Sequence, residues 1–377
     1  MRRRVLLWLL ASLLILFACD NKSRSEPFSF IVLDDLHFAR AADYDSAIGL
    51  EERTLRTVRQ SEATFLPLMN ELKNQANTFI PAPVAIFSCG DIVHGGVKDP
   101  AAQYQRFFAE YNSVSMPVPL YNAVGNHEIE GAGMETAYDS AFLSFMSKEA
   151  GRKITSRHFS LDFGNSHFIL IDCLPPNRRG GDHDQRVFEL MDEQWRWLEA
   201  DLEANRDKGH IFVFMHPTIW PVNSGDVWYV YDPGKQRDFV DLLLKYNVRA
   251  CFAGHEHVYS ITIYENKEGK QLIQMISNSE ISLQETPPGT AIRDYSIRNV
   301  ASGEYPWSQG LQDLVLFYQE RIRYFKKTPR VAGYFIVTVD GPQVSVRMYK
   351  SPGQKLFDSY MITANPAGGT DFSYNQP

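Results

Sequence analysis

The feature of this sequence that most constrains its fold is a series of apolar runs that each end in a short polar tip. Between the first runs lie segments with apolar residues at helical spacing, over 51–75 and 101–111. This repeated order of strand, polar loop and helix is typical of βαβ units in a layered α/β domain. Five runs end in this way, and their tips carry Asp35 and His37, Asp91, Asn126 and His127, His216, and His255 and His257.

The rest of the chain predicts one elaborated domain over 28–360, because no linker interrupts it. The dipeptides Gly164-Asn165 and Asp340-Gly341 each separate two apolar runs, which predicts β-hairpins over 158–172 and 334–349. Helices are expected over 193–205 and 311–325. Segment 282–330 has the least regular pattern and is interpreted as an insertion, and 361–377 as a C-terminal tail.

The N-terminus has the pattern of an export signal. Arg2, Arg3 and Arg4 precede the apolar run Val5–Ala18, which is too short to span about 30 Å of hydrocarbon comfortably. The run ends at Leu16-Phe17-Ala18-Cys19, which resembles the lipobox of bacterial lipoproteins. The resemblance implies a signal peptide over 1–18, lipidation of Cys19 and a tether over 19–27. We therefore expect an exported protein, anchored by lipid to a bacterial membrane and facing the periplasm. Ordinary cleavage after Ala18 and an uncleaved anchor are the alternatives.

Composition narrows the possible partners and the redox chemistry. The formal net charge of −7 does not suit non-specific binding to a nucleic-acid backbone, and none is expected. Apart from Cys19, the chain has Cys89, Cys173 and Cys251, each in or just after an apolar run. We expect these three to be buried free thiols.

The polar tips carry the residue types of a metal site. In open α/β sheets, ligands gather beyond the carboxyl ends of the strands, so loops from five strands can meet on one edge. Residues two apart on an extended chain point the same way, so Asp35 with His37, and His255 with His257, are expected to converge. Carboxylate, carboxamide and imidazole ligands together suit Fe, Mn or Zn.

In chain order, the motifs read Asp35-Leu36-His37, Gly90-Asp91, Gly125-Asn126-His127-Glu128, His216 and Gly254-His255-Glu256-His257. This series resembles the calcineurin-like metallophosphoesterase superfamily, whose blocks run D-x-H, G-D, G-N-H-[DE], H and G-H-x-H. The resemblance implies a four-layer α/β/β/α sandwich with a dinuclear metal site at the strand ends. One metal would take Asp35, His37 and His257, the other would take Asn126, His216 and His255, and Asp91 would bridge them.

The resemblance also implies a reaction. The expected substrate is a small phosphomonoester or phosphodiester, hydrolysed by a metal-bound hydroxide, since metal binding lowers the pKa of water to about 7. Asp91 and His127 are the expected catalytic residues, with His127 as proton donor to the leaving group. A nucleotidase or cyclic nucleotide phosphodiesterase is the alternative enzyme. A surface binding protein that has lost catalysis is the alternative without activity.

Two departures from related families stand at position 94. Purple acid phosphatases have a tyrosine ligand three residues after the bridging Asp, where this chain has His94. Protein serine/threonine phosphatases have Asp-Arg-Gly there, and this chain has His94-Gly95-Gly96, which argues against a phosphoprotein substrate. His94 is interpreted as a supporting residue or as one without a role, in preference to a substrate contact.

Two loops contain candidate substrate contacts. Arg178, Arg179 and His183 follow a predicted strand, and paired arginines can clamp a phosphate by bidentate hydrogen bonds. Trp220 lies in the loop after His216, where an aromatic ring can stack on a base. The alternatives are a solvated loop for the first group and a cover over the strand ends for the second.

Overall fold

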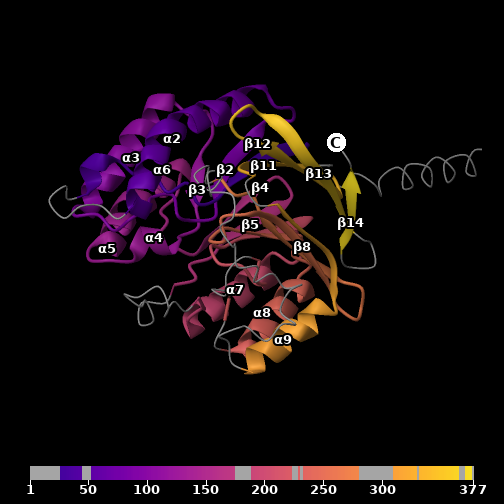
Figure 1. Cartoon of the computed structure of the whole chain (residues 1–377). Helices are drawn as coiled ribbons and strands as arrows, with labels where there is room; N and C mark the ends of the chain where they lie inside the picture. The colour runs from indigo at the N-terminus through magenta and orange to yellow at the C-terminus, as the bar shows by residue number, and fades with distance from the viewer. Residues whose placement is uncertain are drawn as a thin grey trace, which may run out of the picture.

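The computed structural model describes residues 26–44, 52–174, 188–222, 228–229, 232–279, 309–328, 331–364 and 370–375. Two seven-stranded mixed sheets lie face to face in this part of the chain, and helices cover both outer faces (Figure 1). The arrangement is the expected four-layer α/β/β/α sandwich.

The first sheet has the strand order β14-β13-β12-β11-β1-β2-β3. Strands β1, β2 and β3 are parallel, and β11 pairs with β1 in the antiparallel direction. The parallel strands are short and almost wholly buried, as expected for strands covered on both faces. The bounds are β1 Phe28–Leu33, β2 Pro83–Ser88, β3 Leu120–Asn122, β11 Gly333–Asp340, β12 Gln343–Lys350, β13 Lys355–Ala364 and β14 Thr370–Asn375.

The second sheet has the order β10-β8-β9-β7-β6-β5-β4. Its central strands β5, β6, β7 and β9 are parallel. The carboxyl ends of β5, β6 and β7 therefore lie along one edge. The bounds are β4 Phe159–Phe163, β5 Ser166–Leu170, β6 His210–Phe214, β7 Ala250–Ala253, β8 Tyr259–Glu265, β9 Gln271–Ile276 and β10 Ile322–Thr328.

The helices form the two outer layers, with α2 to α6 over one sheet and α7 to α9 over the other (Figure 1). Helices α3 and α8 begin with an aspartate cap followed by proline, the pairing that satisfies a free N–H and presets the first turn. The helical bounds are η1 Ala41–Asp43, α2 Glu52–Thr78, α3 Pro100–Val114, α4 Asn126–Ile129, α5 Met134–Tyr138, η2 Asp139–Leu143, α6 Ser144–Glu149, α7 Asp192–Ala204, α8 Pro233–Lys245 and α9 Gln309–Gln319.

Aromatic rings fill the space between the two sheets. Phe30 on β1 lies 5.1 Å from Phe168 and 5.2 Å from Phe212, measured between ring centroids. Phe87 on β2 stacks on Phe214 of β6 at 4.4 Å. Burying each such ring contributes about 1.5–3 kcal/mol, so this layer fixes the two sheets against each other. It also fixes the edges from which the polar tips emerge.

The C-terminal part of the chain differs from expectation. The helix expected over 311–325 ends at Gln319, and the following residues form β10, which pairs with β8. Residues 309–328 of the expected insertion are thus part of the second sheet and its cover. The expected tail is also partly wrong, since β13 continues to Ala364 and β14 pairs with it. Alternating side chains in these edge strands contact the sandwich, and the sequence pattern did not distinguish that from a tail.

Other expectations have mixed outcomes. Both hairpins form with the expected turns, and Cys89, Cys173 and Cys251 are buried free thiols. The signal peptide, Cys19 and most of the tether lie outside the described residues. Among the described helices, none combines the length and apolar character needed to cross a membrane.

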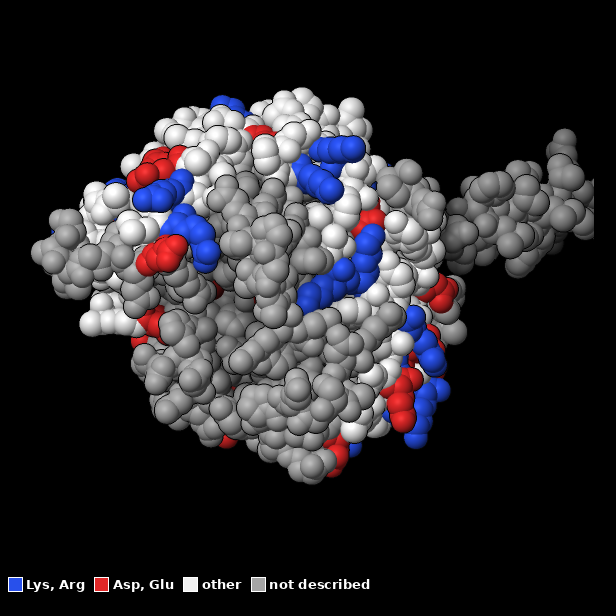
Figure 2. Space-filling model, in the orientation of Figure 1, with Lys and Arg blue, Asp and Glu red and all other residues white. Residues whose placement is uncertain are grey.

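Surface charge is uneven. Figure 2 shows a band of Lys and Arg side chains on the side of the molecule where β13 and β14 lie. On that side, the amino groups of Lys326 and Lys350 lie 5.3 and 4.2 Å from the ring centre of Phe357. The net negative charge of the chain therefore does not exclude local binding of anions.

Candidate metal centre

Loops that follow five strands bring the polar tips together at one edge of the sandwich. The loop after β1 runs beside the loop after β2, because His37 N donates to Asp91 O and Phe38 N donates to Ile92 O. The loop after β7 is held to the one after β6 by Gly254 N, which donates to His216 O. These backbone bonds place side chains from both sheets around a common point.

The side chains form two groups that share Asp91. Asp35, His37, Asp91 and His257 have their donor atoms within 4.8 Å of one another, and Asp91, His216 and His255 form the second group. Nε2 of His37 lies 3.2 Å from Nε2 of His257, and Nε2 of His216 lies 3.2 Å from Nδ1 of His255. Two clusters joined by one carboxylate have the arrangement of a dinuclear metal site.

Asn126 lies beside the second group. Its Oδ1 is 3.0 Å from Nε2 of His216, and its side chain is wholly buried. Asn126 is the first residue of α4, so its position follows from the turn at Gly125. All seven expected metal ligands are therefore close together in the structure.

The backbone at the tips is strained. Asp35, His37, Asp91, His255 and His257 all have φ between 46° and 68°, in the left-handed region that non-glycine residues seldom adopt. Asp35 and His37 do converge on one group, but not because they lie on an extended chain. His255 and His257 belong to the two different groups, as the ligand assignment implied by the resemblance has it. The left-handed turns rotate successive side chains differently from a pleated strand.

Two motif glycines are required by close packing. A Cβ on Gly90 would lie 2.7 Å from Gly125 N and 2.8 Å from Nδ1 of His216. A Cβ on Gly125 would lie 2.3 Å from Oδ1 of Asp91. Any side chain at these positions would displace the groups that define the site.

The two carboxylates have opposite electrostatic surroundings. Burial raises the pKa of Asp35 well above its usual value. Burial alone would also raise the pKa of Asp91, but the charges of His216 and His127 outweigh it and hold that pKa well below normal. Burial would lower the pKa of His216, yet Asp91 raises it to about 9. The ionised carboxylate of Asp91 thus interacts favourably with the positive charge of the neighbouring histidines.

The donor set fits cations. Oδ2 of Asp35 is buried and has no hydrogen-bond partner among the described residues. Nδ1 of His216 lies 2.8 Å from Cys89 O, to which it can donate, so Nε2 is left to bind a metal. A buried carboxylate oxygen without a donor is costly, and a metal ion would remove that cost. These donors suit transition metals such as Fe, Mn or Zn.

Two acidic residues that the sequence analysis did not single out hold the loops. Glu128 accepts from the backbone N–H of Asp91, Val93 and Gly125 at 2.8, 3.1 and 2.6 Å. Asp34 accepts from the backbone N–H of Ser277 and Asn278 at 2.9 and 3.1 Å, after β9. Both side chains are buried, and burial raises the pKa of Glu128 to about 8. A signal for both existed, since Asp34 directly precedes a motif residue and Glu128 is itself the last residue of the Gly125-Asn126-His127-Glu128 motif.

His127 lies at the more open side of the site. It is partly exposed, and its backbone N–H donates to Oδ1 of Asp91 at 2.9 Å. Nδ1 of His127 makes a short contact with His94 O, to which it can donate. His94 is close to the site as well, with its Nδ1 3.2 Å from Nδ1 of His37.

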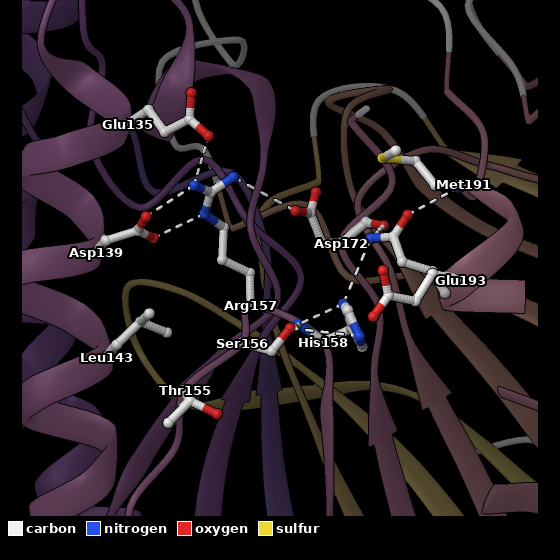
Figure 3. Close-up of a pocket in the computed structure, with 11 residues that line it drawn as sticks. Glu135, Asp139, Leu143, Thr155, Ser156, Arg157, His158, Asp172, Met191 and Glu193 are labelled. Carbon is white, nitrogen blue, oxygen red and sulfur yellow. Dashed lines mark hydrogen bonds and ion pairs between the residues drawn. The ribbon is translucent and has the colours of Figure 1, made fainter. Parts of the chain in front are cut away.

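A cavity of about 300 Å³ is lined by Arg157 and by acidic residues of α5, η2 and α7 (Figure 3). Asp172, which lines it, closely follows β5, and β5 neighbours the strand that leads to His216. Figure 3 shows Arg157 in the wall of the cavity, joined to Glu135, Asp139 and Asp172. Acidic residues outnumber basic ones in this wall, so it is poorly suited to hold the phosphate itself.

The candidate substrate contacts are not supported by the structure. Arg178, Arg179 and His183 lie outside the described residues. Trp220 is fully buried, its ring stacks on Tyr264 at 5.6 Å, and it meets Tyr318 edge-on. The expectation that Trp220 contacts substrate is wrong, because its ring faces are taken up by the core. Trp228 and Tyr229, in the same loop, are also buried.

Comparisons with known proteins agree with this geometry. A family model described as calcineurin-like phosphoesterase matches residues 28–259. Purple acid phosphatase 23 of Arabidopsis thaliana is 25% identical over 224 residues, which are 56% of this chain and 45% of that protein. Serine/threonine-protein phosphatase CPPED1 of Danio rerio is 22% identical over 253 residues, 63% of this chain and 72% of that protein.

A solved structure shows the same fold. Purple acid phosphatase PPD1 from yellow lupin (Lupinus luteus) seeds superposes with a TM-score of 0.54 at 14% identity, covering 91% of this chain and 55% of that one. The chain thus spans about half the length of the purple acid phosphatases that it matches. Since the family model covers more than half of this chain, the chain belongs to the calcineurin-like phosphoesterase family.

Proposed function

We propose that this protein hydrolyses esters of phosphoric acid, using two transition metal ions bound at the shared carboxylate. The observation that carries the proposal is the pair of donor groups that meet at Asp91. One ion would be held by Asp35, His37 and His257. The other would be held by Asn126, His216 and His255. Asp91 would contribute to both. When bound, two such ions lower the pKa of a water and stabilise charge on the phosphate oxygens.

The protein's own residues prepare this chemistry. Burial of Asp35, His37, Asn126 and His216 excludes water from the floor of the site, while His255 and His257 are partly exposed. A phosphate ester would therefore approach from the side of His127, His255 and His257. Strained loops held by Asp34 and Glu128 keep the donors in place before substrate arrives.

His127 is the proposed proton donor. Its Nδ1 can donate to His94 O, so a proton passed to the leaving oxygen would come from Nε2. Its backbone N–H is bonded to Asp91, so the ring is fixed relative to the bridging position. A positioned acid of this kind contributes about 10²–10⁴ in rate.

The proposed substrate is a small phosphomonoester or phosphodiester. The buried position of Trp220 removes the aromatic residue on which a preference for nucleotides rested. The presence of all seven ligand positions and His127 in one place supports an enzyme over a binding protein that has lost catalysis.

The experiment is turnover by metal-free protein reloaded with Mn²⁺, Zn²⁺ or Fe²⁺. Substrates would be para-nitrophenyl phosphate, its bis-ester, a nucleotide and a phosphopeptide, the last because one relative is named a protein phosphatase. Mg²⁺ and Ca²⁺ serve as control metals, since imidazole donors do not suit them. Turnover with a transition metal and none without it is expected. Protein that holds two transition metals and hydrolyses none of these esters would contradict the proposal.

A further inference from the structure

We propose that His94 is a positioning residue that fixes both a metal ligand, His37, and the proton donor, His127. The inference rests on the proposed function, because it concerns the same site. It assigns a role to the residue at which this chain departs from the patterns of related phosphatases.

The first observation is the contact between His94 and His37. Their Nδ1 atoms lie 3.2 Å apart, while Nε2 of His37 lies 3.2 Å from Nε2 of His257 and 3.7 Å from Oδ2 of Asp91. A metal ion needs the lone pair of Nε2, so the ring proton of His37 must be on Nδ1. His94 is then the acceptor of that proton's hydrogen bond. An outer partner of this kind fixes both the tautomer and the orientation of a histidine ligand.

The second observation is the packing of His94 against His127. The two rings are nearly parallel, with centroids 5.0 Å apart and 16° between their planes. The backbone carbonyl of His94 accepts from Nδ1 of His127. One residue therefore contacts the ligand through its side chain and the proton donor through its ring face and backbone.

The third observation is that His94 is itself held firmly. Its backbone N–H donates to Phe38 O at 3.0 Å, next to the bridge between Phe38 and Val93. Tyr44 donates to Gly95 O at 3.2 Å. A Cβ on Gly95 would lie 2.5 Å from His127 O, so this segment lies directly against the backbone of His127. Such support is what a positioning residue requires.

The test measures metal binding on the full chain, independently of turnover. In His94→Ala, the affinity for one of two Zn²⁺ ions should fall about 10–100-fold, the usual effect of losing an outer partner of a ligand. The second ion should bind as before, and excess Zn²⁺ should restore two ions per chain. His94→Gln keeps an acceptor oxygen and should recover most of the affinity.

A second readout follows the tautomer directly. Long-range ¹H–¹⁵N spectra of the Zn²⁺-loaded protein should show His37 protonated on Nδ1, and this signal should broaden or shift in His94→Ala. At saturating Zn²⁺, the fall in kcat from wild type to His94→Ala should be smaller for para-nitrophenyl phosphate than for an ester with a poor leaving group. The matched control is His158→Gln, a partly buried histidine whose ring packs on Trp197 outside this site.

The results separate the two proposals. If the wild type binds two Zn²⁺ ions but hydrolyses no ester, the proposed function fails, and the affinity and tautomer measurements still test His94. Unchanged Zn²⁺ affinity and an unchanged His37 signal in His94→Ala would overturn the inference. So would a third Zn²⁺ ion lost only in that variant, because His37, His94 and His127 would then be ligands of their own ion.

Discussion

The Nε2 atoms of His37 and His257 lie 3.2 Å apart, although 220 residues of chain separate the two histidines. Burial and the neighbouring imidazoles of His127 and His257 lower the pKa of His37 well below its usual value. At this distance one ring can donate to the other, whereas two neutral rings that both turn their lone pairs toward one point repel each other unless a cation lies between them. A cation bound between these rings would offset the cost of bringing them together.

The proposed bridging role of Asp91 gives the first prediction. Asp91→Asn should lower metal content and turnover by orders of magnitude, because a neutral amide cannot balance two cations. Elemental analysis and kinetics on the purified variant measure both. Asp99→Asn is the control, since Asp99 only caps α3 and asparagine caps equally well. An Asp91→Asn protein with two metals and near-normal turnover would show that the bridging assignment is wrong.

Much of the site could be predicted because its residues stand directly after strands. An apolar run followed by Asp35, Asp91 or His216 identifies both the strand and the edge at which its tip must lie. Parallel pairing of β5, β6 and β7 then leaves a single edge for those tips in the second sheet.

What the sequence did not reveal depends on tertiary packing. Trp220 follows the proposed ligand His216 and was a candidate substrate contact, but Tyr264 and Tyr318, far along the chain, enclose it. Residues 370–375 have no strong apolar pattern, and only pairing with β13 makes them a strand. The roles of Asp34 and Glu128 depend on backbone N–H groups, which are the same in every sequence.

Arg157 gives a prediction about stability. It is 12% exposed and binds Asp139 at 2.7 Å, Glu135 at 2.5 Å and Asp172 at 3.5 Å. Arg157→Gln should lower the free energy of unfolding by roughly 2–3 kcal/mol, less than the about 3–5 for a fully buried pair because Glu135 and Asp139 are partly exposed. Urea unfolding of the wild type and the variant measures this difference in free energy. The exposed pair of Arg206 and Glu203 is the control, and Arg206→Gln should change stability by less than about 1 kcal/mol.

His167 gives a prediction about pH. Burial alone would lower its pKa, but hydrogen bonds to Asp201 and Asp162 at 2.8 and 2.7 Å outweigh burial and raise it. The stabilisation of the fold by protonated His167 is therefore complete below the unfolded-state pKa of about 6.5. It is lost as pH rises through the higher folded-state pKa. The stability difference between wild type and His167→Gln should shrink from pH 6 upward.

His158 provides the control of opposite sign. Burial lowers the pKa of His158, so the contribution of its neutral ring to stability is present above the unfolded-state pKa and is lost as pH falls. Denaturant unfolding of the wild type, His167→Gln and His158→Gln at several pH values measures both trends. A stability difference for His167→Gln that grows with rising pH would contradict the assignment of a protonated His167.

Cys19 gives a prediction about location. We propose that it carries the lipid anchor, so Cys19→Ser should leave the protein uncleaved or release it from the membrane fraction. The variant should keep full turnover once loaded with metal, because every residue of the proposed centre lies at Asp35 or later. Fractionation and turnover of the variant test this. A wild type that is soluble after cleavage at Ala18 would show that the lipidation proposal is wrong.

The most direct test of the central claim compares His127→Ala with His216→Ala by metal content and turnover. In the proposed mechanism His127 donates a proton and holds no ion, so His127→Ala should keep close to two metals per chain. Its turnover number should fall at least about a hundredfold for esters with poor leaving groups and less for para-nitrophenyl phosphate. His216→Ala should lose metal and activity together. If His127→Ala loses metal as His216→Ala does, or hydrolyses poor leaving groups at the normal rate, the separation of metal binding from proton donation is contradicted.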